Sequence, residues 1–164
     1  ASFRFPSAGA HTLRIAASLK EKGVKTHLVH ENVYDANSED RLRLTGYAIS
    51  EKMVVLKDVK TAYISLTKAE LDRFHFRKGD TEGLVNWCLS VSGIILGVFF
   101  MERENEIKLS LRSKGSFDVN AMARKHFNGG GHIHAAGGSF EGSLPEAIKK
   151  LESILPSYRD ELND

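Results

Sequence analysis

Three consecutive glycines followed by a histidine, residues 129–132, form the stretch of this sequence best suited to chemistry. A glycine run costs backbone entropy, so a loop that keeps it is expected to need positive φ or a close approach of another backbone. Such a loop can aim successive amides into a concavity that holds phosphate oxygens. His132 could add a hydrogen bond or a positive charge there. The alternative interpretation is a flexible turn between a helix and a strand, with His132 on its rim.

A strand predicted upstream of the glycines ends in an arginine. Residues 106–112 alternate strictly between polar and apolar side chains, which is typical of a strand with one buried face. Arg112 closes this strand, and its planar guanidinium could hold a phosphate through two parallel hydrogen bonds. Ser113 and Lys114 follow directly and are close enough to assist. This segment therefore supplies a second set of candidate phosphate ligands.

Charge is concentrated in the same part of the chain. Residues 108–134 carry five Lys and Arg side chains against one Asp, whereas the whole chain has a formal net charge of +2. A local basic patch in a nearly neutral protein favours a site for an anionic ligand over a general polyanion-binding surface. A solvated basic face remains the alternative on charge alone.

Metal binding is a competing chemistry for the glycine-rich segment. His132 and His134 are two residues apart, so on a strand they would share one face, as some zinc ligands do. A structural zinc site that adds His126 stays open. Because no cysteine and no close carboxylate joins these histidines, we expect no metal ligands and no metal bound to this chain. Cys88 lies in an apolar helical run, where a thiol is usually a small buried hydrophobe.

The elements that must position these residues fall into two parts, with a boundary predicted near residue 52. The first part, 1–52, is expected to be helical, with Gly23 ending one helix and a second beginning at residue 37 or 38. The second part, 53–164, is expected to be α/β with a mixed sheet. Its predicted strands are 53–56, 62–66, 94–101 and 106–112, and its predicted helices follow caps at Thr67, Thr81 or Asp80, Asp118 and Ser143.

Composition excludes several classes of protein. Hydrophobic residues make up 41% and charged residues 27% of the 164 residues, which is typical of a soluble globular protein. The sequence has no run of 18 apolar residues and no signal-peptide pattern at its start, so we expect neither a membrane span nor secretion. A single cysteine cannot form an internal disulfide, which favours a reducing compartment. We therefore expect a cytoplasmic protein.

The ordered motifs together resemble the DHH-associated domain of the DHH phosphoesterase family. The matching segments are 81–86, 108–114, 118–121, 129–132 and 135–137. The resemblance is closest to the group that acts on short oligoribonucleotides and phosphoadenosine phosphate, and it covers about residues 53–155. It implies a mixed-sheet α/β domain, preceded by a helical remnant and linker helix of the catalytic DHH domain, which residues 1–52 resemble. Residues 2–5 are similar to the segment after the last metal-binding aspartate of that domain.

The resemblance also implies which domain of such an enzyme binds substrate and which carries out catalysis. The associated domain binds substrate, while the catalytic domain holds two manganese ions through His and Asp residues that have no equivalent here. This chain is therefore expected to contain no catalytic residue, to be inactive alone, and to work with a DHH catalytic domain. His134 stands where the family often has asparagine. The substrate-binding residues implied are Arg112, Gly129, Gly130, Gly131 and His132, with Ser113, Lys114 and His134 as further candidates.

Several alternatives remain open at the level of sequence. Enzymes acting on cyclic dinucleotides and exopolyphosphatases share these domains, so short RNA is one substrate class among three. A non-catalytic nucleic-acid-binding module is the alternative of another class. Apolar surface that a catalytic domain would normally cover also leaves homodimerisation open.

Overall fold

The computed structural model describes residues 8–163, which form two compact units. Among the described residues, the first unit ends at Ser38 and the second begins at Glu39. The segment 2–5, compared above with the end of a catalytic domain, lies outside the described residues. Within the described part, we find no helix long and apolar enough to cross a bilayer.

Two helices make up the described part of the first unit. α1 spans Ala10–Glu21 and α2 spans Thr26–Tyr34. Gly23 follows α1 with φ of 91°, the left-handed conformation that ends a helix, as predicted from its position. Neither described helix buries a residue. Their exposed apolar side chains include Leu13, Ile15, Leu19, Leu28, Val29 and Val33.

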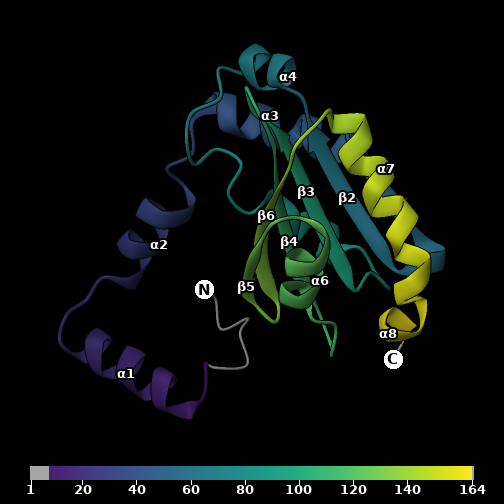
Figure 1. Ribbon diagram of the computed structural model, residues 1–164. Helices are drawn as coiled ribbons and strands as arrows, with labels where there is room; N and C mark the ends of the chain where they lie inside the picture. Colours follow the sequence, from purple (N-terminus) through teal and green to yellow (C-terminus); the bar gives the residue numbers. More distant parts are fainter. Residues whose placement is uncertain (1–7, 164) are drawn as a thin grey trace. The chain divides into compact units, whose positions relative to one another are not determined.

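A six-stranded mixed sheet forms the centre of the second unit, in the order β1-β2-β3-β4-β6-β5 (Figure 1). β2 and β3 run parallel, and the other neighbouring strands pair antiparallel. The predicted α/β class with a mixed sheet is confirmed. The strands are β1 Met53–Leu56, β2 Thr61–Leu66, β3 Leu96–Glu102, β4 Ile107–Ser113, β5 Gly130–His132 and β6 Ala135–Phe140.

Helices pack on both faces of this sheet. Successive strand residues point to opposite faces, and accordingly Phe99 belongs to one hydrophobic cluster and Phe100 to another. α3 (Glu39–Ser50), α4 (Lys68–Arg73) and α5 (Leu84–Ser90) contribute to the cluster of Phe99. The cluster of Phe100 includes side chains of α6 (Val119–His126), α7 (Leu144–Ile154), the 3₁₀ turns Lys57–Val59 and Leu155–Tyr158, and α8 (Arg159–Asn163).

Most of the predicted helix starts are confirmed, and one is wrong. Thr67 and Ser143 each form a complete capping box, and the Asp118 carboxylate accepts hydrogen bonds from two amides of α6. α5, however, begins at Leu84 with Gly83 as its cap, and neither Thr81 nor Asp80 caps it. The Asp80 carboxylate instead accepts from the Arg77 amide at 2.7 Å within its own turn. Residues 80–83 are therefore a turn, which leaves them free to line a cavity.

Glu70 joins three elements through one carboxylate. It completes the capping box with Thr67, forms an ion pair with Lys52 Nζ at 2.8 Å, and accepts from the Tyr47 hydroxyl at 2.5 Å. Burial by itself raises the pKa of Glu70, but the hydrogen bonds from Lys52, Tyr47 and Thr67 outweigh it and lower the pKa from 4.5 to about 2. The folded structure therefore stabilises the ionised form of Glu70 more than its protonated form.

We expect Glu70→Gln to remove part of the acid sensitivity of folding. Because the folded-state pKa is lowered, the contribution of Glu70 is complete above its unfolded value and is lost as pH falls from about 4.5 towards 2. The free energy of unfolding can be measured with urea at several pH values between about 2 and 6. It should depend less on pH in the variant than in the wild type. Asp160→Asn, an exposed carboxylate on α8, is the control. Equal profiles for wild type and Glu70→Gln would contradict the role of this carboxylate.

Candidate functional site

Strand register brings the two predicted halves of the site together. Arg112 on β4 lies opposite Ala135 on β6, and Ala135 lies opposite His132 on β5. Neighbouring strands are about 4.8 Å apart, so the backbones at Arg112 and His132 are separated by about 10 Å. Residues 20 apart in the sequence therefore share one row at the edge of the sheet, within reach of a single small ligand.

Arg112 is a half-buried cation without a matching anion. Its Nη1 donates to the Leu111 carbonyl at 2.9 Å, and within the described residues no carboxylate forms an ion pair with it. Burial lowers the pKa of its guanidinium, although an arginine stays charged in any case. A cation that has lost part of its hydration gains from an anion placed beside it. Arg112 is thus prepared for a phosphate or carboxylate ligand.

A cavity of about 490 Å³ opens beside Arg112 on the face covered by α5. One wall is the turn before α5, and the floor is the exposed row of β4 together with two apolar side chains of β3. Apolar surface beside a few charged groups is typical of small-molecule sites. The residues that line it are Thr81, Glu82, Gly83, Val85, Phe99, Met101, Lys108, Ser110 and Arg112.

Close packing of α5 on β3 depends on Gly97. A Cβ at Gly97 would lie 3.0 Å from the Val85 carbonyl oxygen and 3.1 Å from Cys88 Cβ. Gly97 also pairs with Arg112 across β3 and β4. Glycine at this position therefore lets α5, and the turn that precedes it, approach the strand that carries Arg112.

Two of the three glycines are required by close backbone approach, as the sequence predicts. A Cβ at Gly129 would lie 2.1 Å from the Gly137 carbonyl oxygen, and one at Gly131 would lie 2.4 Å from the Ala135 carbonyl oxygen. The structure differs from the expected row of free amides, because the Gly129 amide donates to the Ala123 carbonyl at 3.2 Å. The glycines therefore hold β5 tightly against β6.

Asn120 fixes the glycine segment, and sequence reasoning did not single it out. Its Oδ1 accepts from the Gly131 amide at 2.9 Å and from Arg124 Nε at 3.1 Å. The amides of Gly129 and Gly131 are therefore both engaged inside the protein. The signals for Asn120 in the sequence were its place two residues after the predicted helix cap Asp118 and its membership of the matching segment 118–121.

The hairpin between β5 and β6 presents two exposed histidines. His132 is the last residue of β5, and His134 lies in the tight turn that follows. The Ile133 carbonyl accepts from the Val119 amide at 2.9 Å and anchors the turn to α6. Because His134 is in a turn, the strand spacing that would place both histidines on one face does not apply. Both side chains reach solvent at the end of the row that contains Arg112.

Neither Ser113, which is buried, nor Lys114, which is exposed, lines the cavity. The buried Ser113 hydroxyl donates to the Phe117 carbonyl at 2.6 Å and lies 3.2 Å from His134 Nδ1. Since its one hydrogen goes to Phe117, we assign Nδ1 of His134 as the donor, which leaves Nε2 pointing outward. Lys114 Nζ donates to the Leu89 carbonyl near the end of α5. Both residues therefore position the site more than they line it.

Metal coordination and thiol chemistry have little support in the described residues. There, no three His, Cys, Asp or Glu side chains gather into a group that could hold a metal ion. His126, the third histidine of the zinc hypothesis, has its Nε2 2.9 Å from the Tyr158 hydroxyl. Cys88 is buried, and burial raises the pKa of its thiol to about 12. It is a small core residue, as its sequence context predicts.

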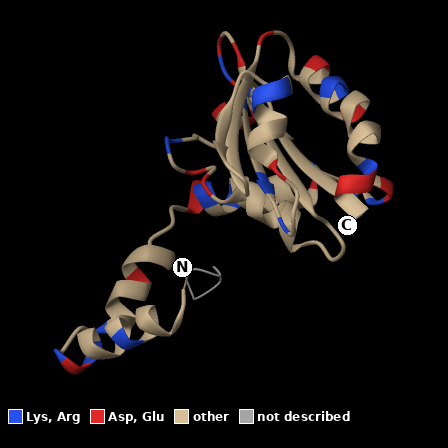
Figure 2. Cartoon of the chain, turned by 60° about the horizontal axis from the view of Figure 1, so that its bottom comes forward, with Lys and Arg blue, Asp and Glu red and all other residues tan. Residues whose placement is uncertain are grey.

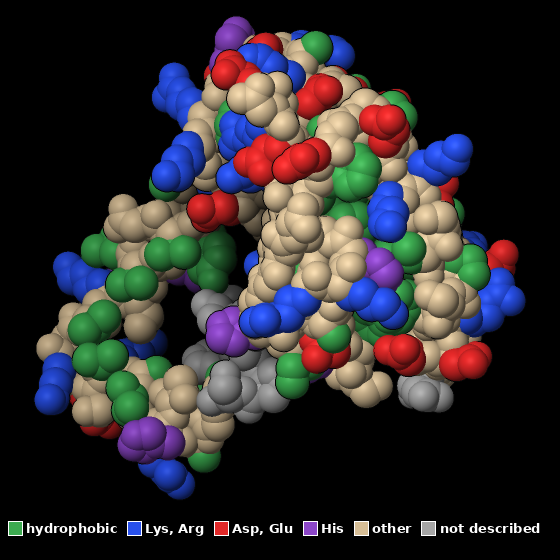
Figure 3. Space-filling model, in the orientation of Figure 1, with side chains coloured by type: hydrophobic (Ala, Val, Ile, Leu, Met, Phe, Trp, Pro, Cys, Tyr) green, Lys and Arg blue, Asp and Glu red, His purple; other side chains and the backbone are tan. Residues whose placement is uncertain are grey.

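Basic side chains near the site are concentrated around α6. Lys and Arg are interspersed with Asp and Glu along the ribbon (Figure 2). Lys, Arg and His side chains gather over α6 and β5, where Arg124, Lys125 and His126 occupy the last turn of α6 (Figure 3). Near α4 and the β3–β4 turn, at the other end of the sheet, acidic and basic side chains are mixed (Figure 3). An anion is therefore favoured at the end that carries Arg112.

Fold and site together define a mixed α/β domain with an open cavity over the central strands β3 and β4 of its sheet, beside Arg112. Residues 59–157 match the family model described as the DHHA1 domain, and the chain belongs to that family. This confirms the resemblance to the DHH-associated domain.

Three similar proteins support the assignment. The proteins named bifunctional oligoribonuclease and PAP phosphatase NrnA are 31% identical in Bacillus subtilis, over 93% of this chain, and 32% identical in Thermus thermophilus, over 98%. A crystal structure of an exopolyphosphatase-related protein from Bacteroides fragilis is 42% identical, covers 99% of this chain and superposes with a TM-score of 0.94. This chain spans 47% of each of these proteins, or about half their length.

Proposed function

We propose that this chain is the substrate-binding part of a phosphodiesterase that hydrolyses short oligoribonucleotides, phosphoadenosine phosphate, or both. The observation that carries the proposal is Arg112, a partly desolvated cation that has no carboxylate partner among the described residues and lines a cavity of about 490 Å³. The names of the two relatives at 31% and 32% identity agree with this substrate class.

The residues of the cavity suit the parts of a nucleotide. Arg112 binds a phosphate, with Ser110 two residues away on the same exposed row able to donate a further hydrogen bond. Phe99 and Met101 give an apolar floor on which a base or ribose can lie. His132 closes the row from β5 and adds a donor next to the phosphate. The chain thus holds and orients a nucleotide.

We assign the hydrolytic step to residues outside this chain. The described residues offer no cluster that fits the manganese ions implied by the family resemblance, so no step here runs through a metal. A DHH catalytic domain is the proposed partner that supplies them, and this chain alone is expected to be inactive. Homodimerisation is a second proposed interaction. A reducing, cytoplasmic location fits a protein with one buried cysteine.

Binding of a fluorescent 5′-phosphorylated RNA dinucleotide to this chain tests the proposal. We expect binding without manganese, weakening as salt rises because phosphate contacts release counterions. His132→Ala should weaken it by about 5- to 10-fold, the effect of losing about one ordinary hydrogen bond. Asp160→Asn, remote from the cavity, should bind like wild type.

Competitors distinguish the remaining substrate classes. Unlabelled linear dinucleotide should displace the probe at lower concentration than a cyclic dinucleotide or polyphosphate. If the cyclic dinucleotide or polyphosphate displaced the probe at the lowest concentration, that compound would instead define the substrate class. Absence of dinucleotide binding by the wild-type chain would overturn the proposal that this domain by itself holds the substrate.

A further inference from the structure

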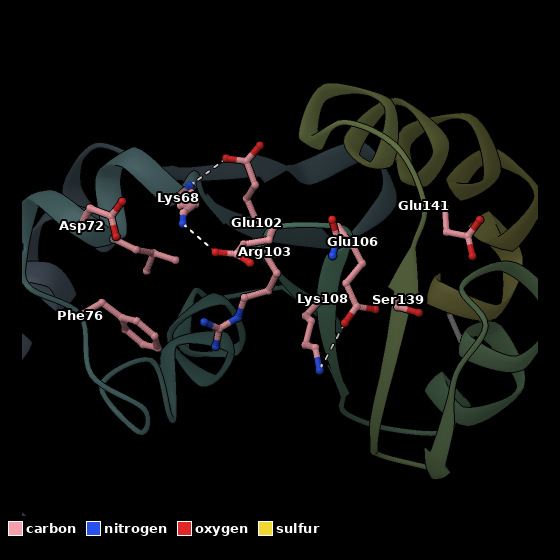
Figure 4. Close-up of a pocket in the computed structure, with 12 residues that line it drawn as sticks. Lys68, Asp72, Phe76, Glu102, Arg103, Glu106, Lys108, Ser139 and Glu141 are labelled. Atoms are coloured by element: carbon pink, nitrogen blue, oxygen red, sulfur yellow. Dashed lines mark hydrogen bonds and ion pairs between the residues drawn. The ribbon is translucent and has the colours of Figure 1, made fainter.

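A second cavity, of about 820 Å³, continues the exposed row of β4 away from Arg112. Lys108 lines both cavities, so the two meet at this residue. In Figure 4, Asp72 and Phe76 lie on one side of the second cavity and Ser139 and Glu141 on the other, with the β3–β4 turn between them. We call the two cavities, which share Lys108, the trough along β4.

The trough offers ligands at regular steps. Arg112, Ser110 and Lys108 alternate with the buried side chains of β4 and share its exposed face. They are about 7 Å apart, so the row from Arg112 to Lys108 spans about 14 Å. A row of this kind suits an extended chain with one anionic group per repeating unit.

The charge of the trough reverses along its length. Five carboxylates line the second cavity against three basic side chains, one of which is Lys108 itself. The basic groups are already engaged: Lys108 Nζ lies 3.4 Å from Glu106, Lys68 Nζ lies 3.4 Å from Glu104, and Arg103 stacks on Phe76 at 5.1 Å. The carboxylates are Asp72, Glu102, Glu104, Glu106 and Glu141. This end of the trough is therefore open in shape but repels anions.

We propose that the acidic β3–β4 turn sets the length of the nucleic-acid chain that this domain accepts. Lys108, paired with Glu106, is the last positive charge of the row and, at about one phosphate per step of the row, lies beside the third phosphate. A fourth or fifth phosphate would lie among the carboxylates beyond it. Charges within about 8–10 Å interact at physiological salt, so each added nucleotide is penalised. The inference rests on the proposed function and names which substrates that site selects.

A length series measures this directly. The ratio of dissociation constants for a 5′-phosphorylated pentanucleotide and dinucleotide should be determined for the wild-type chain and for Glu104→Gln/Glu106→Gln. We expect the double variant to bind the pentanucleotide about 3- to 10-fold more tightly relative to the dinucleotide, and the gain to shrink at high salt. Asp160→Asn/Glu161→Gln adds the same charge on α8, whose Leu162 packs on the other face of the sheet, and should leave the ratio unchanged.

The outcomes separate the two proposals. No dinucleotide binding by the wild-type chain would remove the proposed function and this inference with it. Dinucleotide binding with a length ratio that Glu104→Gln/Glu106→Gln leaves unchanged would overturn the length inference alone. An equal change in the α8 variant would do so as well, because net charge rather than the turn would then be responsible. Circular dichroism checks that both variants are folded.

Discussion

Replacing Arg112 with alanine is expected to weaken dinucleotide binding by about 30- to 700-fold, equivalent to about 2–4 kcal/mol, the range for losing a close charged contact. The effect should be large because Arg112 is half-buried, so it presents its charge to the ligand with little competition from water. Titration of the labelled dinucleotide at two salt concentrations measures it. The variant should also show a shallower salt dependence, since one phosphate contact is missing.

Arg112→Lys is the matched control for that result. Lysine keeps the charge but loses the planar pair of donors, so binding should fall between wild type and alanine. Equal affinities for all three proteins would show that phosphate is bound elsewhere. Since the Arg112 side chain makes a hydrogen bond only to its neighbour's carbonyl among the described residues, thermal unfolding should change little in either variant.

Gly129→Ala is expected to be the most destabilising single substitution in the glycine segment. The new Cβ would lie 2.1 Å from the Gly137 carbonyl oxygen and 2.6 Å from Gly138 Cα, both backbone atoms that cannot move without displacing β6. We expect a loss of about 2–4 kcal/mol in the free energy of unfolding, at or above the usual range for overpacking. Urea denaturation with the midpoint and slope reported separately measures it.

The neighbouring glycine provides the control. A Cβ at Gly130 would meet nothing closer than 3.6 Å, which is an ordinary contact with Arg124 or Asn120. Gly130→Ala should therefore change stability by only about 0.5 kcal/mol. If Gly129→Ala and Gly130→Ala were equally stable, close packing of β5 on β6 would not be the reason for glycine at residue 129.

Local sequence rules predicted much of the fold because their causes are local. The capping boxes at Thr67 and Ser143 need only a hydroxyl and a carboxylate three residues apart, and both form. Alternation on β4 reflects the pleat of a single strand, so the exposed row ending at Arg112 was predictable. The prediction failed at α5, because Asp80 bonds within its own turn and Gly83 begins the helix instead.

The candidate site depends more on pairing between distant segments. The glycine run predicted close backbone approach, but only the β5–β6 register shows which carbonyls are approached. The same packing engages the amides of Gly129 and Gly131, a result that no count of glycines could give. Ser113 illustrates the difference: its sequence position suggested a ligand contact, whereas its buried hydroxyl bonds Phe117 and orients His134.

The sequence alone determined the class of fold, the family and the residue types available for holding a phosphate, since these follow from periodicity, caps and ordered motifs. Tertiary structure decided which of those residues meet. Strand order places His132 in the row of Arg112, Gly97 admits α5 beside it, and the β3–β4 turn brings its carboxylates to the far end of the same trough. Such contacts arise from packing between segments far apart in the chain, and no local rule contains that information.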